Sequence, residues 1–239
     1  MTLIEMWANV KSSLDKKFLL SRPVLRLIEI LGRRSENRMA ELGMIAQAFE
    51  FMSFNNVEGD YFEFGLWRGR TFVYAHKMMR RYNIKDIKLR GFDSFKGLPA
   101  HEDSQDNIWH EGEFCCSETE FHKIMRENRI NKNEYELIPG FYSKSLNTEL
   151  NETLSGVKAA IVYIDCDLYE STIDVLKFIK KYLINGTIVC FDDYFNNCGA
   201  TDQGEARALD EFLQENKTIR FIPYFNFSPL GKSFIIRLN

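Results

Sequence analysis

The run of six apolar residues from Ala159 to Ile164 restricts the fold more than any other feature of the chain. A segment that is apolar at every position is typical of a strand buried on both faces, as at the centre of a parallel sheet. Thr187–Phe191 is a second run of this kind, and a helical pattern over Tyr169–Leu183 lies between the two. A parallel sheet needs helices on both of its faces, so we expect an α/β protein.

The chain from Asp60 onward continues this alternation of strands and helices. The further strands that we expect are Tyr61–Phe64, Lys88–Phe92, Tyr135–Pro139, Ile219–Ile222 and Ser233–Leu238. The further helices are Gly69–Tyr82, Glu118–Asn128 and Glu205–Asn216, and Asn185-Gly186 forms a turn. Only about nine residues, Pro223 to Gly231, separate the last two strands, which is too short for a helical crossover. The sequence therefore predicts a doubly wound, Rossmann-like sheet of seven strands with the last strand antiparallel.

The first 56 residues show only helical patterns. Val24, Ile28 and Leu31 recur at helical spacing, and a second series runs from Met39 to Phe49. We therefore expect an N-terminal helical extension over residues 1–56 and a main domain over residues 57–239. The apolar faces of the extension would cover the main domain or a partner subunit, so we expect a homodimer.

Composition narrows the possible surroundings and partners of the chain. A length of 239 residues, 45% of them hydrophobic, suffices for one large domain. The net charge of −3 gives no broad basic surface, so we expect no nucleic-acid partner. No segment approaches the ~20 apolar residues of a membrane span, and the N-terminus lacks the apolar stretch of a signal peptide. The five cysteines include no C-x-x-C motif, which disfavours disulfides and structural zinc and favours the cytoplasm.

Ligands of a doubly wound sheet bind at the carboxyl ends of its strands, where this chain places glycines and acids. The first strand is followed by the sequence EFGLWRGRT, whose glycines allow a ligand to approach the backbone closely. Trp67 stands where the G-x-G-x-x-G pattern has its second glycine, so a pyrophosphate would fit badly. A cofactor without phosphates, such as S-adenosylmethionine, is compatible with this turn. A tight turn with no ligand explains the same glycines.

Asp93 ends the second predicted strand, in the sequence GFDSFKGLP. An acid at this position can accept hydrogen bonds from both hydroxyls of a ribose. This feature does not distinguish a dinucleotide from S-adenosylmethionine. A helix-capping or turn aspartate is the alternative interpretation.

Three aspartates end the two central strands: Asp165, Asp192 and Asp193. One helix separates these strands, so they should be neighbours and their carboxylates should converge. Mutual repulsion then requires a cation, and hard oxygen ligands favour Mg²⁺ or Ca²⁺. Such an ion would bind an acceptor hydroxyl, lower its pKa and orient it. The alternative is a set of helix-capping aspartates on solvated loops.

Five motifs in order resemble those of the macrocin O-methyltransferase family. They are EFGLWRGRT, GFDSFKGLP, IPGFYSKSL, YIDCDLYEST and IVCFDDY, with GEARALDEF downstream, and the resemblance extends from about Arg38 to Phe212. Enzymes of this family methylate sugar hydroxyls of antibiotics and related glycosides with S-adenosylmethionine and Mg²⁺. The resemblance implies a metal-dependent O-methyltransferase that acts on a small, sugar-containing acceptor.

The resemblance also implies roles for individual residues. Glu63, Gly65 and Gly69, with Thr71 nearby, would line the methionine end of S-adenosylmethionine, and Asp93 and Ser94 would hold its ribose. The metal ligands would be Asp165, Asp192 and Asp193.

The catalytic base is less defined by the resemblance. Related catechol-type enzymes place a lysine three residues after the first metal aspartate, where this chain has Leu168. Asp165 is therefore the first candidate base. His110 or His101, in a long polar segment over residues 94–117, is the alternative.

Part of this long segment, residues 107–114, resembles the family's mobile acceptor lid. Closure of a lid would exclude water from the sulfonium and the nucleophile. Trp109 could stack on a sugar face, or it could anchor the loop in the core.

Other functions fit part of the sequence. Asp165-Cys166-Asp167 is a D-x-D triplet, which metal-dependent glycosyltransferases use to bind a nucleotide diphosphate, but this interpretation leaves EFGLWRG and Asp192-Asp193 unexplained. A non-catalytic scaffold of the same fold is the second alternative. A dinucleotide-dependent oxidoreductase is the last, because the glycine pattern is incomplete.

Overall fold

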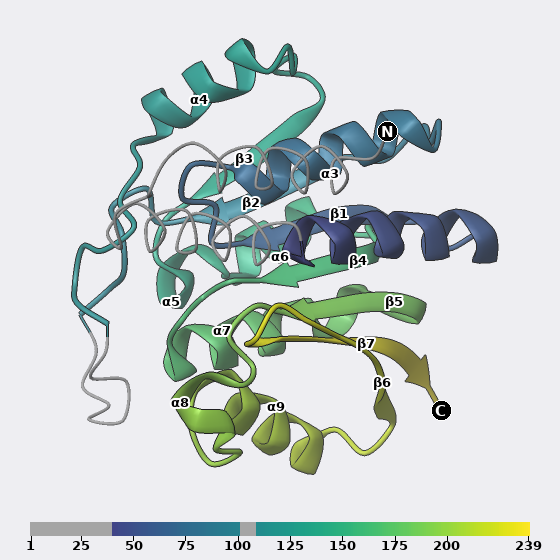
Figure 1. Ribbon diagram of the computed structural model, residues 1–239, viewed down its shortest axis with the longest axis vertical. Helices are drawn as coiled ribbons and strands as arrows, with labels where there is room; N and C mark the ends of the chain where they lie inside the picture. Colours follow the sequence, from purple (N-terminus) through teal and green to yellow (C-terminus); the bar gives the residue numbers. More distant parts are fainter. Residues whose placement is uncertain (1–39, 101–108) are drawn as a thin grey trace, which may run out of the picture. The chain divides into compact units, whose positions relative to one another are not determined.

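A computed structural model describes residues 40–100 and 109–239 and contains a sheet of seven strands in the order β3-β2-β1-β4-β5-β7-β6 (Figure 1). The strands are β1 Asp60–Phe64, β2 Leu89–Asp93, β3 Tyr135–Pro139, β4 Ala159–Ile164, β5 Leu183–Phe191, β6 Ile219–Phe227 and β7 Gly231–Leu238. Strands β1 to β5 pair in parallel, and β7 is antiparallel to both β5 and β6. The predicted fold class is confirmed. The helices and the histidine expected within residues 1–39 and 101–108 lie outside the described residues.

Strand β4 is central because its whole sequence is apolar. Each of its six residues is at most 1% exposed, and β1 and β5 pair with it on either side. Its side chains enter two separate cores, with Ile161 and Tyr163 in one and Val162 and Ile164 in the other. Full burial of a side chain of this size contributes roughly 1.5–3 kcal/mol, so the run stabilises both layers of the domain.

Helices cover the two faces of the sheet. They are α3 Arg70–Arg81, α4 Glu118–Glu127, α5 Tyr142–Ser145, α6 Thr148–Thr153, α7 Tyr169–Ile179, α8 Asn196–Gly199 and α9 Gly204–Glu215, preceded by helical residues 40–55. The 40–55 helix, α3 and α4 supply Phe49, Phe72 and Phe121 to the core that contains Tyr163. Helices α7 and α9 pack into the opposite core. None of the helices in the described ranges combines the length and hydrophobicity required to cross a bilayer.

The helix after β4 and the strand that follows it differ from the prediction. Helix α7 ends at Ile179, a 3-10 turn covers Lys180–Tyr182, and β5 begins at Leu183 rather than at Thr187. The expected Asn185-Gly186 turn is an irregularity inside β5, where the pairing with β4 shifts register. Gly186 has φ 95° there, and a Cβ on it would lie 2.8 Å from Cγ2 of Val57. Gly186 thus has the positive φ typical of a turn, but strand β5 continues through it.

Strand β6 is also longer than predicted. It continues through Pro223 to Phe227, so only residues 228–230 join it to β7. A proline has no N–H to donate to a sheet, but β6 is an edge strand, where a missing donor is tolerated. The antiparallel arrangement expected for the last two strands is confirmed.

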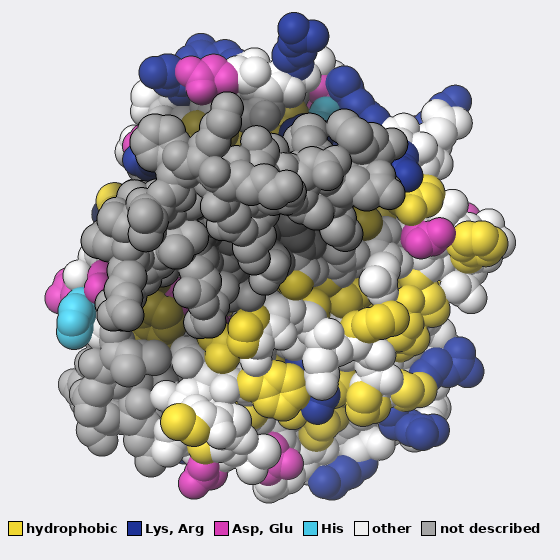
Figure 2. All heavy atoms as spheres, in the orientation of Figure 1, with side chains coloured by type: hydrophobic (Ala, Val, Ile, Leu, Met, Phe, Trp, Pro, Cys, Tyr) yellow, Lys and Arg dark blue, Asp and Glu magenta, His cyan; other side chains and the backbone are white. Residues whose placement is uncertain are grey.

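Exposed apolar side chains are concentrated on the 40–55 helix and the β6–β7 pair. Phe54 is 80% exposed, and Phe225 and Leu230 are also exposed. The rings of Phe51 and Tyr224, 5.6 Å apart, connect the helix to β6. Figure 2 shows hydrophobic side chains gathered on the lower and right-hand part of one face, with Lys and Arg mostly around its edge. The expected homodimer remains a prediction.

The turn after β1 fits against β4 only because residue 65 is glycine. Gly65 has φ 88°, and a Cβ on it would lie 1.8 Å from the carbonyl oxygen of Asp165. Its N–H donates to the carbonyl of Phe92, and the N–H of Asp165 donates to that of Phe64. These contacts hold the carboxyl ends of β1, β2 and β4 together.

Substitution of Gly65 by alanine should therefore destabilise the domain by about 2–4 kcal/mol, because it adds both a steric clash and a left-handed non-glycine residue. Gly156→Ala is the matched control, since Gly156 has φ 80° but no atom within 4 Å of the added Cβ. It should cost about 1 kcal/mol. Chemical denaturation measures both, and equal losses would contradict the close-approach argument.

Candidate active site

A pocket of about 280 Å³ opens at the carboxyl ends of the parallel strands. The loops after β1, β2, β4 and β5 all contribute to its wall, and helix α3 contributes Arg70. The lining includes glycine, aromatic and acidic residues: Gly65, Trp67, Arg70, Asp93, Ser94, Trp109, Phe114, Asp165, Asp167, Asp192 and Asp193. This is the position at which ligands bind in doubly wound sheets.

Asp93 connects the β1 turn to the end of β2. Its Oδ2 accepts from the N–H of Leu66 at 2.7 Å and of Trp67 at 3.3 Å, and its Oδ1 accepts from the N–H of Phe95 at 2.6 Å. Burial raises the pKa of Asp93, and these hydrogen bonds oppose the shift. Asp93 lines the pocket, and a carboxylate has about four acceptor positions, so Asp93 has capacity for a ligand hydroxyl.

Ser94 also lines the pocket, but its hydroxyl is used by its own loop. It donates to the carbonyl of Gly97 at 2.6 Å and accepts from the N–H of Lys96 at 3.0 Å. Its expected role at a ribose remains a prediction.

Three of the expected cofactor residues support the β1 turn from beneath instead of lining the pocket. Glu63 is fully buried and accepts hydrogen bonds from the hydroxyls of Thr71, at 2.6 Å, and of Tyr61. Burial raises the pKa of Glu63 to about 8. Gly69 has φ 66°, and a Cβ there would lie 2.7 Å from the ring of Phe121. The cofactor-binding roles expected for Glu63, Gly69 and Thr71 remain predictions.

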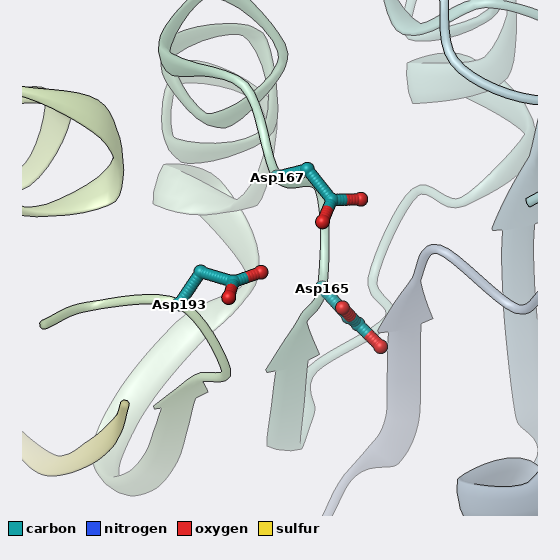
Figure 3. A group of neighbouring side chains, drawn as sticks. All are labelled: Asp165, Asp167 and Asp193. Carbon is teal, nitrogen blue, oxygen red and sulfur yellow. The ribbon is translucent and has the colours of Figure 1, made fainter. Parts of the chain in front are cut away.

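Three aspartates form a compact acidic group at the ends of β4 and β5 (Figure 3). Each of Asp165, Asp167 and Asp193 offers a carboxylate oxygen, and these oxygens lie within 4.8 Å of one another. Burial raises the pKa of Asp165 well above its ordinary range, and the charges of Asp192 and Asp167 raise it further. Burial and then Asp167 do the same to the pKa of Asp193. Such a group is stable only if protons or a cation balance its charge.

Asp192 lines the same pocket but stands outside this compact group. Its Oδ1 accepts a hydrogen bond from the hydroxyl of Tyr163. Burial raises the pKa of Asp192, whereas Tyr163 and the charge of Arg70 lower it. The structure thus groups Asp165 and Asp193 with Asp167 rather than with Asp192, and the metal-binding roles remain predictions. The sequence signal for Asp167 is the D-x-D spacing, which is also typical of glycosyltransferases.

The structure places the two described candidate bases, Asp165 and His110, in different surroundings. Asp165 is on the pocket wall, whereas His110 is exposed on the loop and its backbone N–H donates to Glu113 Oε2 at 3.1 Å. Leu168, at the position of the lysine of catechol-type enzymes, is fully buried. The His110 role stays a prediction without support from the pocket geometry.

Aromatic rings form one side of the pocket mouth. The Phe114 ring lies 5.7 Å from that of Trp67 and 5.6 Å from that of Trp109, and all three residues line the pocket. Trp67 is 48% and Phe114 40% exposed. Trp109 is therefore at the pocket and not an anchor in the core.

The strand order and the pocket at the strand ends define the class of Rossmann-like O-methyltransferase folds. The solved structure of the O-methyltransferase NovP superposes with a TM-score of 0.69 at 25% identity, over 84% of this chain and 80% of that chain. A model of the macrocin-O-methyltransferase (TylF) family matches residues 30–221. The chain therefore belongs to the macrocin-O-methyltransferase family.

Two curated O-methyltransferases are similar to part of this chain. The chain is 29% identical to the demethyldecarbamoylnovobiocin O-methyltransferase of Streptomyces niveus, over 63% of this chain and 58% of the relative. It is 26% identical to the 8-demethyl-8-(2,3-dimethoxy-alpha-L-rhamnosyl)-tetracenomycin-C 4'-O-methyltransferase of Streptomyces olivaceus, over 59% of this chain and 54% of the relative. The similarity thus spans less than two thirds of the length of each relative.

The raised pKa of Glu63 predicts a specific pH dependence of stability. Its ordinary value is 4.5 and its folded value is about 8, so between these values the folded state holds one proton more than the unfolded state. The contribution of Glu63 to stability is complete below pH 4.5 and is lost as the pH rises through 8.

Glu63→Gln resembles the protonated acid and does not titrate. We expect the unfolding free energy of this variant, relative to the unsubstituted protein, to rise by up to a few kcal/mol from pH 5 to pH 8. Urea denaturation at four pH values measures this difference. Glu149→Gln, on exposed α6, is the control and should give a constant difference. A constant difference for Glu63→Gln would show that Glu63 titrates normally.

Proposed function

We propose that this protein transfers a methyl group from S-adenosylmethionine to a hydroxyl of a small, sugar-containing acceptor, with the help of a divalent cation such as Mg²⁺. The observation that carries the proposal is that one pocket contains the Gly65 turn, Asp93 and the compact acidic group. Family membership and the rhamnosyl substrate in the name of one relative support the reaction type and the acceptor class.

The pocket suits S-adenosylmethionine better than a dinucleotide. The Gly65 turn brings the backbone close to Asp165, while Trp67 stands at the position where a pyrophosphate-binding turn has its second glycine. Asp93 is held by three backbone N–H groups and keeps acceptor capacity for a ribose hydroxyl. These residues bind and orient the donor and need no phosphate.

The acidic group has the ligand chemistry of a hard divalent cation. Carboxylates this close together repel one another, and burial followed by the charges of neighbouring acids raises the pKa values of Asp165 and Asp193. Asp165 and Asp193 would hold the ion, with the third carboxylate from Asp167 or Asp192. A bound Mg²⁺ acts as a Lewis acid that makes an acceptor hydroxyl easier to ionise.

The remaining chemistry falls to side chains of this chain. Asp165 is the candidate acceptor for the proton of the acceptor hydroxyl, because its carboxylate lines the pocket beside the acids that would hold the cation. The Trp67, Trp109 and Phe114 rings offer apolar surfaces against which the C–H face of a sugar can stack. Methyl transfer is then a direct displacement at the sulfonium, favoured by alignment in a site that excludes water.

A metal-dependent glycosyltransferase is the second candidate, because Asp165 and Asp167 of the D-x-D triplet do lie together. Calorimetry with S-adenosylmethionine and with nucleotide sugars, each with Mg²⁺, separates the two functions. Transfer of a labelled methyl group to a panel of glycosides then tests the reaction itself. Binding of nucleotide sugars without binding of S-adenosylmethionine would refute methyl transfer.

The affinity for a metal ion can distinguish Asp167 from Asp192 as the third ligand. If the compact group binds the ion, Asp167→Asn should raise the Kd for Mn²⁺ at least tenfold, while Asp192→Asn should change it less. The reverse order would restore the assignment made from the sequence. Calorimetry or electron paramagnetic resonance gives both constants, and Asp193→Ala should abolish binding in either case. Binding retained by Asp193→Ala would contradict a metal site here.

Asp93→Ala should weaken S-adenosylmethionine binding by about 10- to 100-fold, because hydrogen bonds to a charged acceptor contribute roughly 1.5–3 kcal/mol each. Ser94→Ala is the control, and its effect should be smaller because the Ser94 hydroxyl already bonds within its loop. Affinity is measured by calorimetry without metal. An unchanged affinity for Asp93→Ala would refute the ribose assignment.

A further inference from the structure

Glu205 is a buried acid beside the compact acidic group, and the proposed reaction uses none of its atoms. It lies in the first turn of α9 and is 1% exposed. Its Oε2 accepts a hydrogen bond from the backbone N–H of Asp193 at 3.0 Å. Its Oε1 is shielded from solvent and has no hydrogen-bond partner among the described residues. A half-paired buried carboxylate is costly, so its presence requires a reason other than stability.

The hydrogen bond from the Asp193 N–H to Glu205 holds the chain in place where it leaves the sheet after β5. Asp193 is the second residue after β5, and the segment up to α9 contains the irregular α8, with Asn197 and Cys198 at positive φ. Glu205 ties this segment to a helix whose Ala208 and Leu209 are buried in the core. The backbone of Asp193 is therefore held by a rigid element.

Capping of α9 does not explain Glu205. The N-cap residue of α9 is Gln203, which makes no side-chain capping bond, and Glu205 bonds to a different segment 12 residues away. A negative charge in a first helical turn is favourable, but an exposed residue would supply it without the cost of burial. The feature specific to Glu205 is its bond to a residue of the acidic group.

We propose that Glu205 is a positioning residue of the metal centre, which holds the Asp193 backbone so that the Asp193 carboxylate faces Asp165 and Asp167. This inference rests on the proposed function, because it assumes that the acidic group binds a divalent cation. Residues that orient metal ligands typically change metal affinity 10- to 100-fold when they are removed. Glu205 should thus set the affinity for the cation without touching the methyl donor.

The test compares two substitutions of similar size. Glu205→Gln keeps a carbonyl that can accept from the Asp193 N–H, whereas Glu205→Met removes the acceptor and fills the space. We expect the Kd for Mn²⁺, measured by electron paramagnetic resonance, to stay within about threefold for Gln and to rise at least tenfold for Met. The Kd for S-adenosylmethionine without metal should not change. Glu215→Met, at the exposed end of α9, is the matched control.

The outcomes separate this inference from the function on which it rests. If the unsubstituted protein does not bind Mn²⁺, or if Asp193→Ala still binds it, the metal part of the proposed function is wrong. If the unsubstituted protein binds Mn²⁺ and Glu205→Met binds equally well, only the positioning role is wrong. Circular dichroism melting checks folding, and Glu205→Ala replaces Met if Met unfolds. Unfolding of both, with Gln folded, would assign Glu205 to stability and overturn the proposal.

Discussion

Repulsion between carboxylates that end neighbouring parallel strands is the constraint on which the site depends. Parallel strands deliver their carboxyl ends to one edge of the sheet, so Asp165 and Asp193 must share one space whatever their distance along the sequence. Burial removes the water that would screen their charges, which raises both pKa values. The domain keeps this unfavourable arrangement because the large apolar cores on the two faces of the sheet stabilise it.

The acids near the site differ in the partners that the fold gives them. Tyr61 and Tyr163 belong to the same core and donate to Glu63 and Asp192. Asp93 is held by backbone N–H groups of the loops after β1 and β2. Glu63, Asp192 and Asp93 thus have hydrogen-bond donors of their own, while Asp165, Asp167 and Asp193 bring three carboxylate oxygens within 4.8 Å of one another, an arrangement that favours a cation.

The sequence predicted the sheet well because its signals were local. The apolar runs of β4 and β5 and the short link between β6 and β7 each determine one step of the topology. It failed where tertiary contacts override local signals, as at Gly186 inside β5 and Pro223 inside the edge strand β6. The start of β5 and the end of β6 could not be read from turn residues alone.

The same distinction between local signals and tertiary contacts explains why the sequence did not separate the roles of Asp192 and Asp193. Successive side chains of a strand point to opposite faces, and β5 alternates in this way, with Cys190 in one core and Phe191 in the other. Beyond the strand, the Asp192 carboxylate bonds to the hydroxyl of Tyr163, whereas the Asp193 carboxylate lies with those of Asp165 and Asp167, so the two adjacent aspartates do not play equivalent roles. A sequence motif shows that both acids are present but not that they diverge. Glu205 was missed for a related reason, since its partner is the backbone of a residue in another segment.

Leu168 affects the choice of catalytic base, because it stands where catechol-type enzymes have a lysine. With an apolar residue at the position of the lysine and with His110 absent from the pocket wall, the acids are the candidate bases that line the described pocket. Protons and a divalent cation then compete for the same oxygens, because each can offset the same repulsion. An acid whose pKa is raised by its neighbours becomes less basic once a cation balances them, so proton acceptance must rely on an oxygen that the cation leaves free. A carboxylate has two oxygens, so Asp165, which lines the pocket, could bind a cation through one oxygen and keep the other for a proton.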